Sequence, residues 1–337
     1  MINSFDISVI ICTYKPQREY FEPCLHAVAA LDVSELNVEV VLVDNNSPEP
    51  IENQTYISDF IQRNNVKLIK ETKQGLSYAR IAGVANTTAP IVVFFDDDNA
   101  PASDYLQKVK KYFDTYSFLG ILGPGNVEVL YLNQLITKRL EELRYMFQEK
   151  HTNAFEYACI PDSVRCYPPG TGFVVRREVL MIYANDVIQY NYQTTGRSGN
   201  NLIGAEDIQI ILTSVKMNLA IGVAPELKIK HLTPEKRTQI SYLKKLRYGN
   251  IKSYFPAIIE VFPEKREDIN AMQSGLSGIR LLLSFIILIM NVIKTGNVTN
   301  FHLNLSYKLG WYAGIYCASK SQLPWLAKIL IKMNKLE

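Results

Sequence analysis

The stretch PIVVFFDDDN, residues 90–99, passes directly from a continuous apolar run into three aspartates. A run of this kind predicts a strand that is covered on both faces, which is typical of parallel sheets. Asp96, Asp97 and Asp98 then stand where the strand ends. Three adjacent carboxylates repel one another, so burying them without a positive partner would cost several kcal/mol. We therefore expect a cation or a basic side chain beside them.

Three similar apolar runs precede this stretch, at residues 7–12, 38–43 and 66–69, with helical patterns between them. Together with residues 91–95 they predict βαβ units and a doubly wound, mostly parallel sheet that has helices on both faces. Ligands of such sheets bind beyond the carboxyl ends of the strands. Because Thr13, Asp44 and Asp96 stand at three of these ends, the sequence predicts an α/β fold with its site at that edge.

The acidic triplet predicts a metal site. Side chains two apart on an extended segment face the same way, so Asp96 and Asp98 would converge on one ligand and Asp97 would point elsewhere. Mg²⁺ and Mn²⁺ prefer oxygen ligands and are often held by one or two carboxylates together with substrate phosphates. The alternative is a solvated acidic loop, with Asn99 and Pro101 starting the next helix.

Two other segments carry candidate ligand contacts. Asp44 ends the run VEVVLVD before a turn-like NNSP, where a carboxylate can accept from a ribose hydroxyl or a base N–H. Gly75 would allow close backbone approach, and Arg80 could reach a phosphate or brace the carboxylates. The alternatives are an Asx turn or helix cap at Asp44 and a surface position for Arg80.

Later in the chain, Glu206 and Asp207 open a helical pattern. A carboxylate there can take the proton of an attacking hydroxyl, or it can simply favour the helix dipole. His231 can supply a third metal contact, hold a diphosphate, or be structural. Between residues 131 and 150 the pattern is helical and charged, and residues 170–172 (Gly-Thr-Gly) predict a loop over the site.

A change in charge divides the chain. Residues 241–337 contain 13 Lys/Arg and 5 Asp/Glu, although the formal net charge of the whole chain is only +3. We therefore predict a catalytic domain over residues 1–240 and a helical, basic extension over residues 241–337. A basic segment can bind nucleic acid or an anionic membrane surface, and the apolar run 281–293 favours the membrane. This run is shorter than the roughly 20 residues that span a bilayer, so it is either an interfacial helix or a buried one.

The compartment follows from the cysteines and the N-terminus. Five cysteines, an odd number without the CxxC spacing of zinc sites, argue against a disulfide framework and for a reducing compartment. No basic region precedes a long apolar stretch at the N-terminus, so we expect no signal peptide. The expected location is cytoplasmic, or peripheral on the inner face of the membrane if residues 281–293 are interfacial.

Five motifs stand in order along the chain: ISVIICTYKP, VDNNSP, GLSYARIAG, FFDDDN and GAEDIQI. This pattern resembles the family 2 glycosyltransferases of GT-A fold over roughly residues 6–240. The resemblance implies that Asp96 and Asp98 form a DxD motif that binds the donor through Mn²⁺ or Mg²⁺. It also implies that Asp207 is the general base, with Glu206 beside it. The other implied roles are donor-site contacts at Thr13, Tyr14, Asp44, Gly75, Arg80 and Asp97, and an acceptor-side loop at Gly170, Thr171 and Gly172.

The implied reaction is an inverting, single-displacement transfer from a nucleotide-sugar, with UDP the commonest nucleotide, to a hydroxyl acceptor. The acceptor would be a glycan or a lipid-linked molecule of surface polysaccharide biosynthesis, and no nucleic-acid partner is expected. The divalent metal would stabilise the departing diphosphate. Ile81 stands where the family usually has Asn, and the QxxRW motif of processive synthases is missing after Asp207. The missing motif argues for single additions rather than polymer extrusion.

Two other classes of protein fit parts of the pattern. A nucleotidylyltransferase has a similar sheet and acidic metal site. Enzymes of that class share a Gly-rich basic loop after the first strand. This chain has CTYKP there, at residues 12–16. A non-catalytic nucleotide-sugar-binding scaffold is the second alternative, and the presence of both the acidic triplet and the Glu206–Asp207 pair argues against it.

Overall fold

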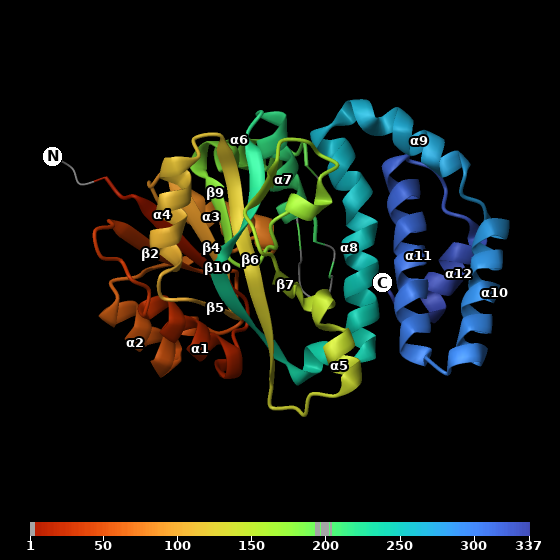
Figure 1. Ribbon diagram of the computed structural model, residues 1–337, viewed down its shortest axis with the longest axis horizontal. Coiled ribbons are helices and arrows are strands. Elements are labelled where there is room, and N and C mark those ends of the chain that lie inside the picture. Colours follow the sequence, from red (N-terminus) through yellow and green to blue (C-terminus); the bar gives the residue numbers. More distant parts are fainter. Residues whose placement is uncertain (1–3, 193–195, 197–201, 203) are drawn as a thin grey trace. The chain divides into compact units, whose positions relative to one another are not determined.

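The computed structural model describes residues 4–192, 196, 202 and 204–337 (Figure 1). The chain forms two compact units, one of Met1–Ile188 with Ile210–Glu235 and the other of Gln189–Gln209 with Lys236–Glu337. The first unit contains the sheet, and the second is helical over residues 236–337. The division into functional domains between residues 240 and 241 stays a prediction.

The first unit is built on one sheet with the strand order β3-β2-β1-β4-β9-β6-β10-β5. Neighbours β3, β2, β1 and β4 are parallel, and β6 is parallel to β10, while β9 runs antiparallel to both of its neighbours. This arrangement confirms the predicted mostly parallel α/β sheet. In chain order the strands of this path are β1 (Ile7–Thr13), β2 (Val38–Asp44), β3 (Lys67–Lys70), β4 (Ile91–Asp96), β5 (Asn99–Pro101), β6 (Leu119–Leu132), β9 (Phe173–Arg176) and β10 (Ala220–Pro234).

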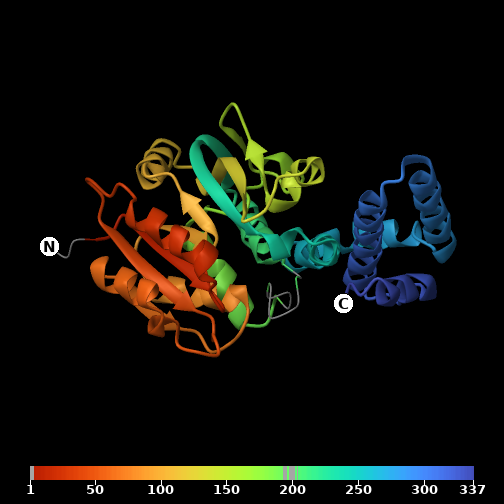
Figure 2. The ribbon, with the colours of Figure 1, turned by 90° about the horizontal axis from the view of Figure 1, so that it is seen from below.

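Helices cover both faces of this sheet (Figures 1 and 2). Side chains alternate between the faces of a strand, and those of Ile7, Val9 and Ile11 in β1 join one core with α1, α2 and α4. Ile10 faces the other way and touches α3, where a Cβ on Gly83 would come within 2.5 Å of its Cγ2. The helices of this unit are α1 (Arg18–Ala29), α2 (Thr55–Arg63), α3 (Leu76–Ala85), α4 (Tyr105–Thr115), α5 (Lys138–Glu142) and α6 (Arg177–Ile188), and α7 (Glu206–Lys216) crosses into it from the second unit.

Two local expectations are wrong. Between residues 131 and 150 the only α-helix is the short α5, because β6 continues to Leu132 alongside β10 and a 3-10 turn follows at Arg144–Phe147. Two short strands, β7 (Lys150–His151) and β8 (Glu156–Ala158), come next. Asn99 and Pro101 do not start a helix either. They form β5, which pairs with β10, and α4 begins only at Tyr105. In both places pairing with a distant strand overrides the local pattern.

The second unit confirms the predicted helical C-terminal region. It contains α8 (Ile240–Val261), α9 (Arg266–Ser274), α10 (Gly278–Thr295), α11 (Val298–Ala318) and α12 (Trp325–Met333), which appear as the teal-to-blue helices in Figure 2. Gly310 and Gly314 let α11 lie directly against α8, because a Cβ at either glycine would come within 2.8 Å of a carbonyl oxygen of α8. Bulkier residues there would push the two helices apart.

The apolar run 281–293 lies in α10 and is exposed. Leu281 is its only buried member, so the expectation of a buried helix is wrong. By length and composition α10 would be able to cross a membrane. Only 6% of its 18 residues are buried within the structure.

Cysteine labelling tests this fold. All five cysteines are free thiols; Cys159 and Cys317 are exposed, whereas Cys12 and Cys24 are buried. Burial raises the pKa of Cys12 to about 12 and also raises that of Cys24. Because the thiolate is the reactive form, we expect iodoacetamide to modify Cys159 and Cys317 rapidly in mildly alkaline buffer and to spare Cys12 and Cys24. Peptide mass mapping before and after urea unfolding measures this, and rapid native labelling of Cys12 would contradict the buried position of β1.

Candidate active site

Three strand ends meet at one edge of the sheet. In the parallel register Thr13 of β1 lies opposite Asp44 of β2, and Cys12 lies opposite Asp96 of β4. The carboxyl ends of these neighbouring strands therefore bring together the loops that the sequence analysis selected. The polar groups of these loops define the candidate site in the first unit.

The three aspartates after β4 have different partners. The Thr13 hydroxyl donates to Asp97 Oδ2 at 2.7 Å, and Asp96 Oδ1 lies 3.8 Å from Arg80 Nη2. Asp98 Oδ2 lies 3.5 Å from Nε2 of His231, with both side chains largely buried. The backbone turns at residues 97–98 instead of staying extended, so strict alternation does not hold there. The shared ligand of Asp96 and Asp98 stays a prediction.

Arg80 is not a surface residue. Its side chain is 2% exposed and comes from α3, on the face of the sheet that Ile10 also occupies. The guanidinium carbon lies 5.2 Å from the ring centroid of Phe94 and 5.9 Å from that of Phe173, which are paired across β4 and β9. A guanidinium held against two rings keeps its charge and its direction. Arg80 is thus placed to brace Asp96.

Asn99 connects the acidic turn to the Gly172 loop and is fully buried. Its Oδ1 accepts from the backbone N–H of Asp96 at 3.1 Å and from that of Gly172 at 3.2 Å. Its Nδ2 donates to Asp98 Oδ1 at 2.8 Å. The turn is also fastened to β10, because the Leu232 N–H donates to the Asp98 carbonyl at 2.8 Å. One amide side chain therefore fixes both the acidic turn and its neighbour.

The predicted loop at Gly170, Thr171 and Gly172 is buried rather than solvated. The hydroxyl of Tyr105 donates to the Gly172 carbonyl at 2.6 Å, and the N–H of Thr171 donates to Gln148 Oε1 at 3.2 Å. Gly172 has φ +68°, and a Cβ there would lie 2.8 Å from the Tyr105 hydroxyl. Both the backbone angle and the space require glycine. The loop is joined to the acidic turn through Asn99, and its contact with an acceptor stays a prediction.

Asp44 and Gly75 belong to a second cluster, on the β2 side of the site. Asp44 Oδ1 accepts from the Ser47 N–H at 2.9 Å, which confirms the local turn that was the alternative for this residue. Asn45 bridges the next loop, since its Oδ1 accepts from the Gly75 N–H and its Nδ2 donates to the Lys73 carbonyl, both at 2.8 Å. Gly75 has φ +134° and caps α3. These contacts join the loop after β2 to the start of α3.

Tyr14 follows Thr13 and is half-buried. Hydrogen bonding to Gln74, and then to Lys15, holds the pKa of its hydroxyl below the usual value. The Lys15 ammonium lies 5.1 Å from the Tyr14 ring centroid. The aromatic ring and the cation together form a surface suited to a base and a phosphate.

One ring nitrogen of His231 has a defined partner. Its Nδ1 lies 2.7 Å from the Phe147 carbonyl oxygen, which can only accept, so Nδ1 carries the proton. Nε2 then faces Asp98 Oδ2. Metal-binding histidines typically donate their other ring N–H in this way, and two ligands of one small divalent ion lie roughly 3 Å apart. Asp98 and His231 therefore fit two positions around such an ion. No group of three or more metal-binding side chains occurs among the residues described.

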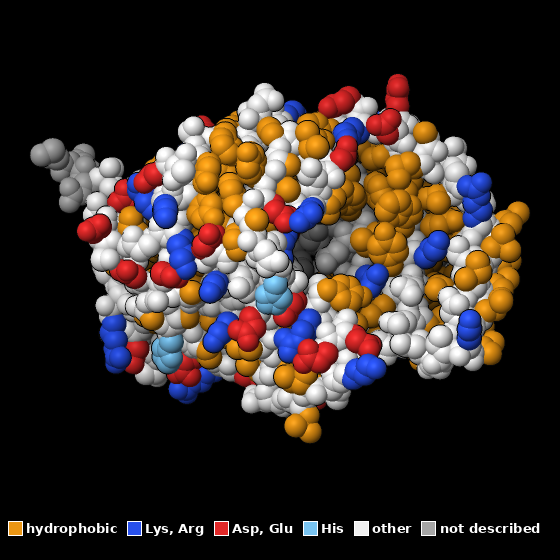
Figure 3. Space-filling model, viewed as in Figure 1, with side chains coloured by type: hydrophobic (Ala, Val, Ile, Leu, Met, Phe, Trp, Pro, Cys, Tyr) orange, Lys and Arg blue, Asp and Glu red, His pale blue; other side chains and the backbone are white. Residues whose placement is uncertain are grey.

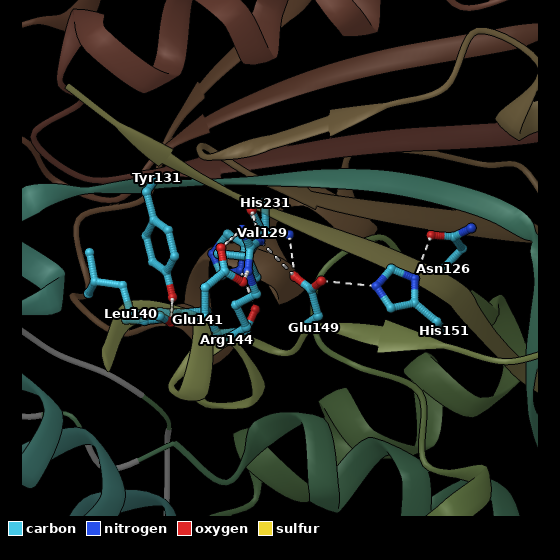
Figure 4. Close-up of polar contacts among 10 residues, drawn as sticks. Asn126, Val129, Tyr131, Leu140, Glu141, Arg144, Glu149, His151 and His231 are labelled. Carbon is cyan, nitrogen blue, oxygen red and sulfur yellow. Dashed lines mark hydrogen bonds and ion pairs between the residues drawn. The ribbon is translucent and has the colours of Figure 1, made fainter. Parts of the chain in front are cut away.

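Figure 4 shows the polar contacts of Arg144 and Glu149, which lie on either side of Phe147 in the sequence. Val129 lies opposite His231 in the pairing of β6 with β10. Arg144 Nη1 donates to the Val129 carbonyl at 2.6 Å, and the Val129 N–H donates to Glu149 Oε2 at 2.7 Å. Glu149 also contacts His151 Nε2 at 2.9 Å. The turn that carries Phe147 is thus fastened to the strand beside His231.

Residues 8–181, just over half of the chain, match the family model described as Glycosyl transferase family 2. The chain belongs to glycosyl transferase family 2. An uncharacterized glycosyltransferase of Nostoc sp. is 25% identical over 193 residues, which is 56% of this chain and 57% of that protein. Glycosyltransferase AglE of Haloferax volcanii is 31% identical over 128 residues, 38% of this chain and 41% of that protein. The matched regions span about half the length of these curated relatives.

Two solved structures show a weaker likeness to this chain. GalNAc-T7 with UDP, GalNAc and Mn²⁺ is 15% identical, with a TM-score of 0.49 over 77% of this chain and 48% of that one. S. aureus TarS 1–349 is 16% identical, with a TM-score of 0.48 over 91% of this chain and 90% of that one.

Glu206 and Asp207 of this family 2 chain lie in the second unit, at the start of α7. Glu206 is buried, and its Oε2 accepts from the Ala205 N–H at 3.1 Å. This bond gives an acceptor to a backbone N–H at the helix start, where the helix itself supplies none. Asp207 is half-buried. Its role as a base stays a prediction from the sequence.

Sequence reasoning missed Asn99, Asn45, Tyr105 and the Phe147 carbonyl as parts of the site. Asn99 was visible as the residue after the triplet, but its amide could not be assigned to the Gly172 loop without the pairing of β5 with β10. The Phe147 carbonyl has no sequence signal, because any residue can supply a backbone oxygen.

The substitution Asn99→Ala tests whether this residue organises the site. We expect the free energy of unfolding to fall by at least about 2 kcal/mol, because two buried N–H groups lose their acceptor at about 1–3 kcal/mol each. We also expect weaker donor binding. Urea denaturation and calorimetry measure the two effects, with the exposed Asn86→Ala as the control. If Asn99→Ala matched the control in both measurements, the organising role would be wrong.

Proposed function

We propose that this chain is an inverting glycosyltransferase that moves a sugar from a nucleotide-sugar to a hydroxyl acceptor. The observation that carries the proposal is the buried pair of Asp98, just after β4, and His231 of β10, whose Nδ1 is held by the Phe147 carbonyl. Membership in glycosyl transferase family 2 supports sugar transfer as the reaction class. It also argues against the nucleotidylyltransferase alternative.

The donor would bind across the ends of β1, β2 and β4. Asp44 and Tyr14 stand where the nucleoside would lie, with the Tyr14 ring available to stack on the base and Asp44 to accept from the ribose. Thr13 and Asp97 would act as one unit, because the hydroxyl donates to that carboxylate. Gly75 would let the backbone approach the donor closely, and Arg80 would hold Asp96 in position.

A divalent metal, Mn²⁺ or Mg²⁺, would be held by Asp98 and His231, with Asp96 as a further ligand. When bound, it would supply positive charge for the diphosphate that departs from the sugar. The chain's own contribution is to fix both ligands before the donor arrives. Asn99 holds Asp98 at 2.8 Å, and the Phe147 carbonyl holds His231. Preorganised ligands cost no reorganisation during the reaction.

Asp207 would take the proton from the acceptor hydroxyl as it attacks the anomeric carbon, with Glu206 beside it at the helix start. Attack from the face opposite the leaving diphosphate inverts the anomeric configuration, so no covalent intermediate forms. The loop at Gly170, Thr171 and Gly172 would contact the acceptor. We propose a glycan or a lipid-linked molecule as that acceptor, a UDP-sugar as the first donor to test, and a cytoplasmic site of action on surface polysaccharide precursors.

Calorimetric titration with UDP-, dTDP- and GDP-sugars, with Mn²⁺ and with chelator, tests the donor and the metal together. We expect one donor to bind only with metal, and Asp98→Ala to weaken that binding and to remove its dependence on Mn²⁺. The control for a lost carboxylate is Asp104→Ala, which removes a side chain that is 51% exposed. Unchanged metal dependence in Asp98→Ala would contradict the ligand assignment, and the absence of binding by all three donors would favour the scaffold alternative.

The base assignment has its own test. We expect Asp207→Asn to lower kcat by at least about 100-fold, the usual contribution of a general base, and to leave the donor Kd nearly unchanged. The control is Asp268→Asn, which removes a first-turn carboxylate from α9 and so reports on helix dipole effects alone. Transfer assays and donor titration give the two numbers. Normal turnover by Asp207→Asn would rule out this residue as the base.

A further inference from the structure

The helix α10 has an apolar face that no described residue of its unit covers. Its inner stripe, which includes Leu281, Phe285 and Leu288, packs into a core with α11 and α12. The rest of its apolar side chains point to solvent, and Figure 3 shows hydrophobic side chains along the edge where Figure 1 labels α10. The exposed members are Ile279, Leu282, Leu283, Ile286, Ile287, Ile289, Met290 and Ile293.

These side chains form one continuous surface. Ile279, Leu283, Ile286, Met290 and Ile293 recur at spacings of three and four, which places them along one side of a helix. We call this surface the α10 face. The surfaces of monomeric proteins rarely carry so long an uninterrupted apolar strip without using it to bind something.

The chain segment that carries the α10 face has charged side chains of a single sign. Residues 269–336, which include all of α10, α11 and α12, contain seven Lys/Arg and no Asp/Glu. Arg280 and Lys294 lie near the two ends of α10 itself. A surface of this charge attracts anions and repels a second copy of itself.

The helix α12 has a similar exposed side. Trp325 and Met333 are among the most exposed apolar residues of the chain, at 75% and 72%. Lys328 and Lys332 lie on the same side of the helix by their spacing and are also exposed. Tryptophan and lysine next to an apolar surface are typical of segments that lie at the boundary between lipid and water.

We propose that the α10 face is a membrane-docking surface that lies in the headgroup region of an anionic bilayer. The apolar side chains would enter the acyl boundary, and the lysines and arginines would contact lipid phosphates. Nucleic acid would use the cations but not the apolar strip. Because the inner stripe of α10 contributes to the core of the helical unit, the helix lies along the membrane rather than crossing it. This inference does not depend on the proposed transfer reaction.

Sedimentation of the full chain with vesicles tests the proposal. We expect binding to phosphatidylcholine vesicles that contain phosphatidylglycerol and much weaker binding to phosphatidylcholine alone. Raising the salt concentration to about 1 M, where the screening length is about 3 Å, releases the protein. We expect Ile286→Glu with Met290→Glu to weaken binding at least about tenfold, because burying one such side chain contributes about that factor.

The matched control is Leu135→Glu with Ile136→Glu, two exposed apolar residues of the first unit. It should bind vesicles normally. Circular dichroism and donor binding show whether the α10 variant remains folded. A variant that still binds donor but not vesicles has lost the docking surface and not the proposed transfer site. The proposal is overturned if anionic vesicles are not bound, or if the variant binds as well as the control. It is also overturned if bound protein resists salt, as a spanning helix would, or if the α10 substitutions abolish a dimer without changing vesicle binding.

Discussion

The candidate site depends on the hydrogen bonds of one buried side chain, that of Asn99. Its amide oxygen accepts two backbone N–H groups, from the end of β4 and from the Gly172 loop, while its amide nitrogen holds Asp98. The position of Asn99 is set in turn by the pairing of β5 with β10, which places it opposite His231. Three segments that are distant in the sequence thus share one fixed point. Without these hydrogen bonds, the repulsion among the three carboxylates would act on an acidic turn whose backbone is not held in place.

Much of the fold could be predicted because the β1 to β4 half of the sheet follows local rules. Each strand there is a short apolar run, and each has its parallel neighbour. No predicted strand limit differs from the observed one by more than one residue, although β3 differs at both of its ends. Thr13, Asp44 and Asp96 came together for the same reason, since parallel strands end at one edge. The half formed by β9, β6 and β10 was harder to predict. Its long strands pair across a large separation in sequence, and the pattern between residues 131 and 150 suggested a helix instead.

The chemistry of the site was predictable only as far as side-chain type determines it. Carboxylates after a strand indicate a cation, and Arg80 and His231 were candidates from their positions alone. Their burial was not predictable, because it comes from Phe94 and Phe173 around Arg80 and from the Phe147 carbonyl beside His231. The same limit applied to residues 281–293. An apolar run has the same composition in a core and on an exposed face, and only the packing of α10 with α11 and α12 separates the two.

The contacts around His231 connect two strands and one turn of the first unit. β10 carries the histidine and pairs with β6 at Val129, and both backbone groups of Val129 are bound by Arg144 and Glu149, which flank the turn of Phe147. The carbonyl of Phe147 accepts a hydrogen bond from Nδ1 of His231, so the other ring nitrogen, Nε2, faces Asp98. All of these residues belong to the first unit. The first unit therefore holds Asp98 and His231 through its own strands and through the turn of Phe147.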